Sequence, residues 1–195
     1  MSTLIWDSLT HAEVKVIVAA RKGGAAVISE YDWRRPDQFA ALKTDFQYRV
    51  RSTLVRALLL DQFSSEPTHA NGVRIVGAFI VGGINLEGCV VSHNLTLQRC
   101  YVDCDPSNPK DVGLNITEAR TQTIDLGGTR VAGIRGQRLM MEGGLFLQDG
   151  FRSDGRVRIS GDISEVYRAR AGSSALSSQP IRGEERLNPL WTLKI

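Results

Sequence analysis

At 195 residues the chain is long enough for one domain with its own core, and its 42% hydrophobic content is ordinary for a globular protein. Its net charge is only +3, and residues 72–164 carry ten basic and ten acidic side chains, so the sequence lacks the basic block typical of nucleic-acid binding. No apolar run approaches the ~20 residues that span a bilayer, the first residues lack a secretory leader, and three cysteines are too few for a disulfide framework. We therefore expect a cytoplasmic protein without a transmembrane segment, for which direct binding of nucleic acid is not expected.

Residues 1–71 are expected to form an N-terminal helical cap of two helices. The first, about 10–22, begins at a capping box formed by Thr10 and Glu13 and ends at the glycines 23 and 24. A longer helix is expected over 37–62, where apolar residues recur every three or four positions at Phe39, Leu42, Phe46, Val50, Leu54 and Leu58. Arginines 49, 51 and 56 are interspersed there, and we interpret them as a solvated outer face rather than a nucleic-acid surface.

A repeat of eleven residues begins at Val73. The first three lines are VRIVGAFIVGG, INLEGCVVSHN and LTLQRCYVDCD, each with apolar or small residues at positions 1, 3, 6 and 8. Residues two apart in a strand point to the same side, so each pair faces inward from a short strand. Short strands that all face one axis form a coil, whose successive turns pair at about 4.8 Å.

The pattern resumes after a proline-containing interruption at 105–113 and fails at VRISGDIS, 157–164, where polar residues enter the inward column. Eight lines of eleven residues correspond to about four coils of 22. The sequence therefore predicts a mainly β protein with a β-solenoid over 72–164.

Three blocks, GVRIVGAFIVGGINLEG, IDLGGTRVAGI and GLFLQDGFRSDGRVRISG, resemble those of bacterial pentapeptide-repeat-like proteins. The resemblance implies a right-handed four-sided β-helix, often preceded by helices. Proteins of this kind are often labelled "membrane-associated oxidoreductase", and some pentapeptide-repeat proteins inhibit nucleic-acid enzymes by imitating DNA. Strict pentapeptide repeats differ from the eleven-residue lines found here.

No catalytic, cofactor-binding or metal-binding residue is predicted. Cys89 and Cys100 stand at the same small inward position and are interpreted as buried structural thiols, and Cys104 completes no ligand set. The three histidines, 11, 69 and 93, are interpreted as surface residues without a catalytic arrangement. The glycines of IVGGINLEG do not have the G-x-G-x-x-G spacing of a dinucleotide site and are interpreted as turn residues.

Position 7 of each line faces outward, and there the sequence places the candidate interaction surface. Phe79 and Tyr101 lie one 22-residue coil apart and are expected to be neighbours, with Phe151 next in the row. Exposed aromatic residues in a row either lie under the N-terminal helices or bind a partner. The other residues at position 7 are Val90, Arg120, Arg130 and Met140.

Residues 165–195 are expected to form a polar linker followed by an apolar docking tail. The tail, LNPLWTLKI, supplies two further candidate interaction residues, Leu190 and Trp191. It would dock on an end of its own coil or on that of a neighbour, so a homodimer formed through a coil end or the tail stays open.

The leading functional hypothesis is a non-enzymatic scaffold or regulator that binds a protein partner through its β surface or its tail. Two alternatives stay open. The first is inhibition of a nucleic-acid enzyme by DNA mimicry, which the even charge balance does not favour. The second is the oxidoreductase activity that the family label suggests.

Overall fold

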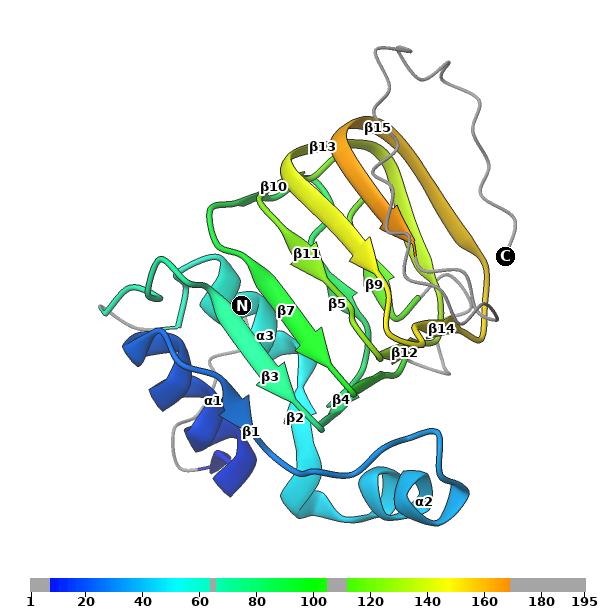
Figure 1. The fold of residues 1–195 in the computed structure, drawn as a ribbon. Coiled ribbons are helices and arrows are strands. Elements are labelled where there is room, and N and C mark those ends of the chain that lie inside the picture. Colours follow the sequence, from blue (N-terminus) through cyan, green and yellow to red (C-terminus); the bar gives the residue numbers. More distant parts are fainter. Residues whose placement is uncertain (1–7, 64–65, 105–111, 169–195) are drawn as a thin grey trace.

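The computed structural model describes residues 8–63, 66–104 and 112–168, the last five of them by backbone alone. Its first part contains α1 (His11–Lys22), β1 (Ala26–Val27), α2 (Pro36–Thr44), β2 (Arg49–Arg51) and α3 (Ser52–Leu59), with a 3-10 turn at Phe46–Tyr48 (Figure 1). The remaining elements are all strands. They are β3 (Val73–Val76), β4 (Phe79–Val81), β5 (Ile84–Asn85), β6 (Val90–Val91), β7 (Leu95–Gln98), β8 (Tyr101–Val102), β9 (Leu114–Asn115), β10 (Arg120–Thr121), β11 (Ile124–Asp125), β12 (Arg130–Val131), β13 (Ile134–Leu147), β14 (Arg152–Ser153) and β15 (Val157–Arg168).

Helix α1 begins and ends where the sequence predicts. The backbone N–H of Glu13 donates to Thr10 Oγ1 at 3.2 Å, and the backbone N–H of Thr10 donates to Glu13 Oε2 at 3.0 Å. At the other end Gly23 adopts a φ of 71°, the left-handed conformation that glycine takes without strain. The predicted capping box is confirmed.

The single helix predicted over 37–62 is wrong, because that segment contains α2, the 3-10 turn, β2 and α3. The Asp45 carboxylate accepts the backbone N–H of Gln47 at 3.0 Å and so caps the 3-10 turn that follows α2. The chain then extends, and β2 pairs with β4 through the register Arg49–Phe79 and Val50–Ile80. Val50 is fully buried from a strand, so its place in the apparent helical stripe was coincidental.

The strands form two sheets, and every pairing in the described residues is parallel. The larger sheet has ten strands in the main order β1-β3-β7-β11-β13-β10-β6, with β5, β9 and β15 attached through further pairings. The smaller sheet has the order β14-β12-β8-β4-β2. Figure 1 shows the long strands β13 and β15 curving over the end of the molecule, so that the larger sheet curls around the core.

The predicted right-handed four-sided β-helix with a separate helical cap is wrong. Strands β13, of 14 residues, and β15, of 12, run past the predicted corners and join the predicted walls into one curled sheet. The supposed cap is also part of the sheets, since β1 pairs with β3 and β2 with β4. The structure is therefore a mixed α/β fold of two parallel sheets with three α-helices in its described part.

The repeat did predict which residues pair. Val73 pairs with Leu95 and Phe79 pairs with Tyr101, each 22 residues apart. Across the interruption that contains 105–111 the interval lengthens, and Val90 pairs with Arg120.

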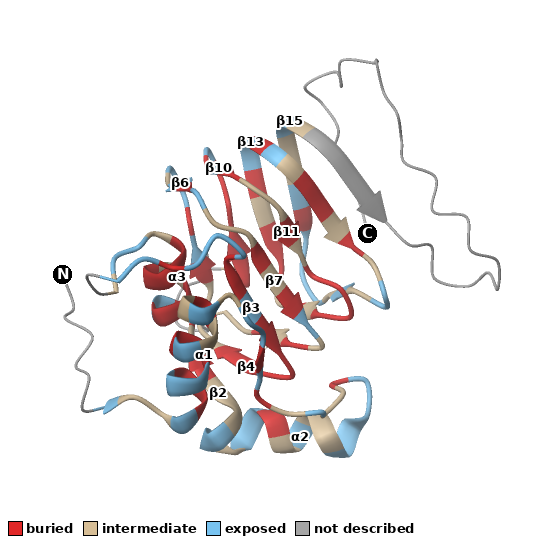
Figure 2. Ribbon diagram, turned by 60° about the vertical axis from the view of Figure 1, so that its left-hand side comes forward, coloured by how far each residue is buried: buried red, intermediate tan, exposed pale blue. Residues whose placement is uncertain are grey.

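The core lies inside the curled sheet and under the inner faces of α1 and α3 (Figure 2). The inward positions of the repeat lines are nearly all buried, among them Val73, Ile75, Ile80, Ile84, Leu86, Leu95, Leu97 and Val102. Helix α3 adds Leu54, Val55, Leu58 and Leu59, and α1 adds Val16 and Ile17. Burial of so continuous an apolar set is the main stabilising contribution, at about 1.5–3 kcal/mol for each large side chain.

Candidate functional site

The predicted aromatic row begins as expected, but it is not exposed. The rings of Phe79 and Tyr101 stack with centroids 5.2 Å apart at 21°, which confirms that they are neighbours. Phe79 is only 1% exposed, however, and Tyr101 is half-buried. The row continues with Arg130 and Arg152, because these residues are the register partners of Tyr101 and of each other. Phe151, predicted to follow Tyr101, instead packs against the core.

The segment that leads into α2 covers this row. The Phe39 ring meets the edge of Tyr101 at 5.1 Å, and the Trp33 indole N–H donates to the carbonyl of Gly128 at 2.5 Å. Of the two alternatives for this surface, cover by the N-terminal part of the chain or binding of a partner, the structure supports cover, since Trp33 itself is buried.

Arg130 holds the cover and the sheet together. Its guanidinium carbon lies 5.2 Å from the centroid of Phe39, 5.6 Å from that of Tyr101 and 5.7 Å from that of Trp33. Its Nε also donates to Asp154 Oδ1 at 2.8 Å. A guanidinium in contact with aromatic faces and one carboxylate is well satisfied within the chain, so this cluster is structural.

The hydroxyl of Tyr101 faces the same carboxylate, with its oxygen 3.3 Å from Asp154 Oδ2. Burial, followed by the negative charges of Asp154 and Asp103, raises the pKa of Tyr101 to about 12. Tyr101 is therefore a neutral hydrogen-bond donor at any ordinary pH. It is not poised to transfer a proton.

Two other candidate residues, Leu190 and Trp191, lie outside the described residues. The predicted linker and docking tail, from 169 onward, lie outside them too. Their proposed roles stay predictions.

The cysteines divide into a buried and a more accessible group. Cys100 is fully buried, as predicted, and burial raises the pKa of its thiol to about 12. Cys89 is half-exposed, which corrects the expectation that it is buried, and its sulfur lies 3.6 Å from Arg56 Nη2. Cys89 lies in the turn before β6, where its backbone N–H donates to the Leu86 carbonyl, so the shared position in the repeat did not produce equal burial.

The surface interpretation of His93 also needs correction, because its side chain is only 10% exposed. Nε2 of His93 lies 2.8 Å from Asp61 Oδ2, while Asp61 Oδ1 accepts the backbone N–H of Thr68 at 2.8 Å. A histidine oriented by a carboxylate is half of a hydrolytic triad, but no hydroxyl or thiol of the described residues hydrogen-bonds to this ring. The pair connects the loop after α3 to the turn before β7. Because 32 residues separate its members, spacing in the sequence gave no signal for it.

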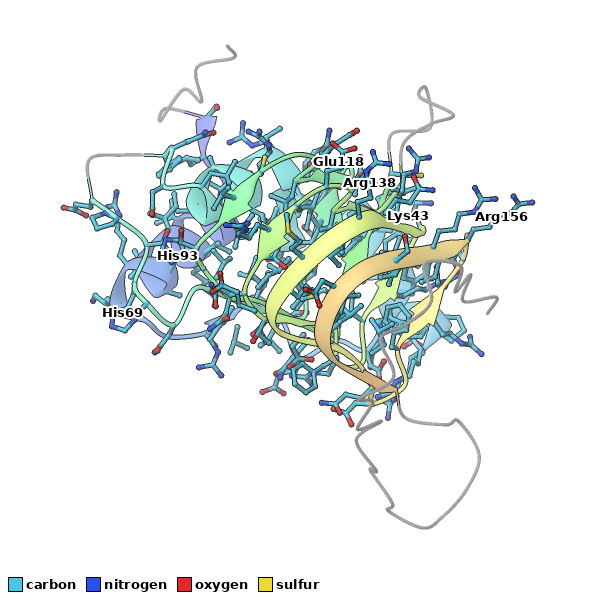
Figure 3. All side chains as sticks on the ribbon, turned by 90° about the horizontal axis from the view of Figure 1, so that it is seen from above. Lys43, His69, His93, Glu118, Arg138 and Arg156 are labelled. Carbon is cyan, nitrogen blue, oxygen red and sulfur yellow. The ribbon has the colours of Figure 1, made fainter. Side chains whose placement is uncertain are left out.

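No candidate metal site is found in the described part of the chain. It contains no group of three or more His, Cys, Asp or Glu side chains that could hold a metal ion. Figure 3 shows His69 and His93 on the same side of the molecule, yet the ring of His69 accepts the backbone N–H of Asn71 and does not join the pair with Asp61.

Two exposed apolar residues lie on β6 and β13, the strands on either side of β10 in the larger sheet. Val90 is 68% exposed and Met140 is 43% exposed, and Arg120 is the register partner of both. We call these three residues the Val90–Met140 patch. Position 7 of the repeat correctly predicted that all three face outward.

Charged side chains beside the patch are already paired with one another. Glu118 forms an ion pair with Arg138, and these two side chains lie together in Figure 3. Gln122 Nε2 donates to Glu142 Oε2 at 2.7 Å. Arg120 forms no ion pair within the described residues, and its nearest polarisable contact is Met140 Sδ at 3.9 Å. Within the described residues the patch is thus a cation without an ion-pair partner, flanked by two exposed apolar side chains.

None of the helices in residues 8–63, where all three α-helices lie, has the length and hydropathy needed to cross a membrane. Comparison with family models, curated proteins and solved structures finds no match to this chain.

Proposed function

We propose that this protein is a non-enzymatic interaction scaffold that binds a protein partner through the Val90–Met140 patch. The observation that carries the proposal is the arrangement of the patch, in which two exposed apolar side chains flank an arginine that has no carboxylate partner among the residues that the structure describes. Methionine and arginine are enriched in protein interfaces, and arginine is among the residues that contribute most to the binding energy. The three strands that present them belong to one continuous sheet, so the surface is pre-organised and loses little entropy on binding.

The partner is expected to present a carboxylate flanked by apolar side chains. The guanidinium of Arg120 would form a bidentate pair with that carboxylate, and Val90 and Met140 would exclude water from it. A surface whose central group is a cation does not suit a DNA mimic, which must be acidic. The three cysteines are free thiols, which supports a reducing compartment such as the cytoplasm.

The test compares affinity capture from the native host by the wild-type chain and by an Arg120→Glu/Met140→Ser variant. The matched control is Val14→Ser/Val18→Ser, which removes two equally apolar side chains from α1, each 44% exposed. We expect one stoichiometric partner to be retained by the wild type and the control and lost by the patch variant. With that partner purified, the patch variant should bind at least tenfold more weakly.

Equal capture by all three proteins would refute the proposal, provided that circular dichroism shows the same fold for each. The other possible occupant of the patch is a second copy of the chain, and light scattering tests for it by measuring the oligomeric state. If the wild-type chain forms a dimer that the patch variant does not form, the patch binds a second copy and the assignment to a different partner is wrong.

A further inference from the structure

A second surface feature is a polar groove of about 380 Å³ on the outer face of β3, β7, β11 and β13, away from the Val90–Met140 patch. Four amides, two threonine hydroxyls, one guanidinium, one carboxylate and one aromatic ring contribute to it. They are Asn71, Arg74, Asn94, Thr96, Gln98, Thr123, Asp125, Phe146 and Gln148.

The strand register sets the order of side chains along the groove. Arg74 pairs with Thr96, Thr96 pairs with Asp125, and Asp125 pairs with Phe146. Paired residues of neighbouring strands stand about 4.8 Å apart, so the row extends roughly 14 Å across four strands. A cation, a hydroxyl, a carboxylate and a ring therefore follow one another at regular intervals on a rigid surface.

The polar side chains are held in place by the backbone and keep further bonding capacity. The carboxylate of Asp125 accepts the backbone N–H of Gly127 at 2.9 Å and also a hydrogen bond from the Gln98 side chain. The carbonyl oxygen of the Asn94 side chain accepts the backbone N–H of Thr123 at 3.1 Å, which leaves the amide N–H groups to donate elsewhere. The Asn71 side chain is instead held through its nitrogen, which donates to the carbonyl of Gly23 at 2.8 Å. The side-chain oxygen of Asn71 is thereby left as an acceptor.

The charge of the groove distinguishes between classes of ligand. One guanidinium and one carboxylate offset each other, whereas a nucleic acid would need several cations along its backbone. Many polar groups and a single ring are likewise a poor match for an apolar ligand. Adjacent donors and acceptors suit hydroxyl groups, each of which both donates and accepts, and the face of a ring suits the C–H side of a sugar.

We infer that the groove binds an uncharged carbohydrate chain, with the Phe146 ring packed against one sugar and the amides hydrogen-bonded to hydroxyl groups. Among the residues whose side chains the structure describes, Asp125 is the only carboxylate that lines the groove. Hydrolysis of a glycosidic bond ordinarily requires two carboxyl groups facing the bond. The groove is therefore assigned to reversible binding without cleavage.

The test uses a panel of neutral oligosaccharides derived from glucan, mannan, xylan and galactan, with binding measured by saturation-transfer NMR and isothermal titration calorimetry. We expect at least one fragment to bind with 1:1 stoichiometry. Phe146→Ala and Gln98→Ala should each weaken that binding at least tenfold. Arg120→Ala, on the other surface, should leave it unchanged.

Absence of binding across the panel would overturn the inference, and so would binding that neither groove variant weakens. Gln98 is exposed, so Gln98→Ala keeps the test valid even if Phe146→Ala perturbs the fold. A heparin fragment and single-stranded DNA form the charged arm, and tighter binding of either one, lost in Arg74→Ala, would show that the ligand is an anion. Comparing the affinity of the best fragment with that of its parent polysaccharide shows whether the groove binds a free oligosaccharide or a stretch of polymer.

Discussion

Trp33 anchors the segment that covers the smaller sheet, so Trp33→Ala should strongly destabilise the protein. The indole is 3% exposed, its N–H donates to the Gly128 carbonyl, and it stands near the guanidinium groups of Arg130 and Arg152. Truncation of a buried Trp to Ala costs about 3–5 kcal/mol. For a chain of this size each kcal/mol lowers Tm by about 2–4 °C, so the expected fall is roughly 6–20 °C.

Trp33→Phe separates the hydrogen bond from the packing. It keeps most of the buried ring but leaves the Gly128 carbonyl without its donor, at a cost of about 1–3 kcal/mol. The control is Phe46→Ala, in the 3-10 turn that follows α2, where the ring is 72% exposed and the expected change is within about 0.5 kcal/mol.

The assays are thermal unfolding by circular dichroism and hydrogen exchange of the smaller sheet. We expect Trp33→Ala to increase exchange at β4 and β8, because the cover over Phe79 and Tyr101 is loosened. The reasoning is refuted if Trp33→Ala unfolds within about 2 °C of the wild type and leaves the exchange of both strands unchanged.

Four other perturbations test the core and its polar contacts. Arg51 donates to the fully buried carboxylate of Glu13, so Arg51→Met should cost about 3 kcal/mol in urea unfolding by leaving that charge uncompensated. Burial alone would raise the pKa of Glu13, but the hydrogen bonds from Arg51 and from the backbone outweigh burial and hold the pKa below its usual 4.5. The free energy of unfolding that Glu13 adds relative to Glu13→Gln should therefore be constant above about pH 4.5 and fall at lower pH. Thr129→Val should lose about 1–3 kcal/mol in the same urea assay, because the buried hydroxyl donates to a backbone carbonyl at 2.7 Å. Cys89 should react with a thiol reagent at pH 8 in the folded protein while Cys100 reacts only after unfolding, and equal rates would contradict the burial of Cys100.

Local signals in the sequence were sufficient for α1, whereas the sheets depend on contacts that the sequence does not reveal. The capping box and Gly23 act within a few residues, so they can be recognised from the letters alone. Strand β13 passes through Gly136, which looked like a gap in the repeat, because its backbone is paired on both sides by β9 and β15. Such continuity depends on partners far along the chain.

The same contrast applies to the two proposed binding surfaces. The repeat placed Val90, Arg120 and Met140 outward, but only the structure shows that they are register partners while Phe79 is covered. The groove had an overlooked signal. Arg74, Thr96, Asp125 and Phe146 each stand second in a repeat line, and Gln98 and Gln148 each stand fourth. In the predicted coil, residues at the same repeat position of successive turns are neighbours. The polar residues at these outward positions could therefore have been aligned with one another, as the aromatic residues at position 7 were.

The parallel pairing of the strands also sets an order of assembly during synthesis. Strands β1 and β2 leave the ribosome first and pair with β3 and β4, and β7 and β8 then add to those in turn. Parts of both sheets can therefore grow in the direction of translation, whereas β5 and β6 must wait for β9 and β10, their partners among the described strands. The bond from Trp33 to Gly128 spans 95 residues, so the cover over the smaller sheet can form only when β8, the third of its five strands along the chain, and the turn before β12 have both emerged.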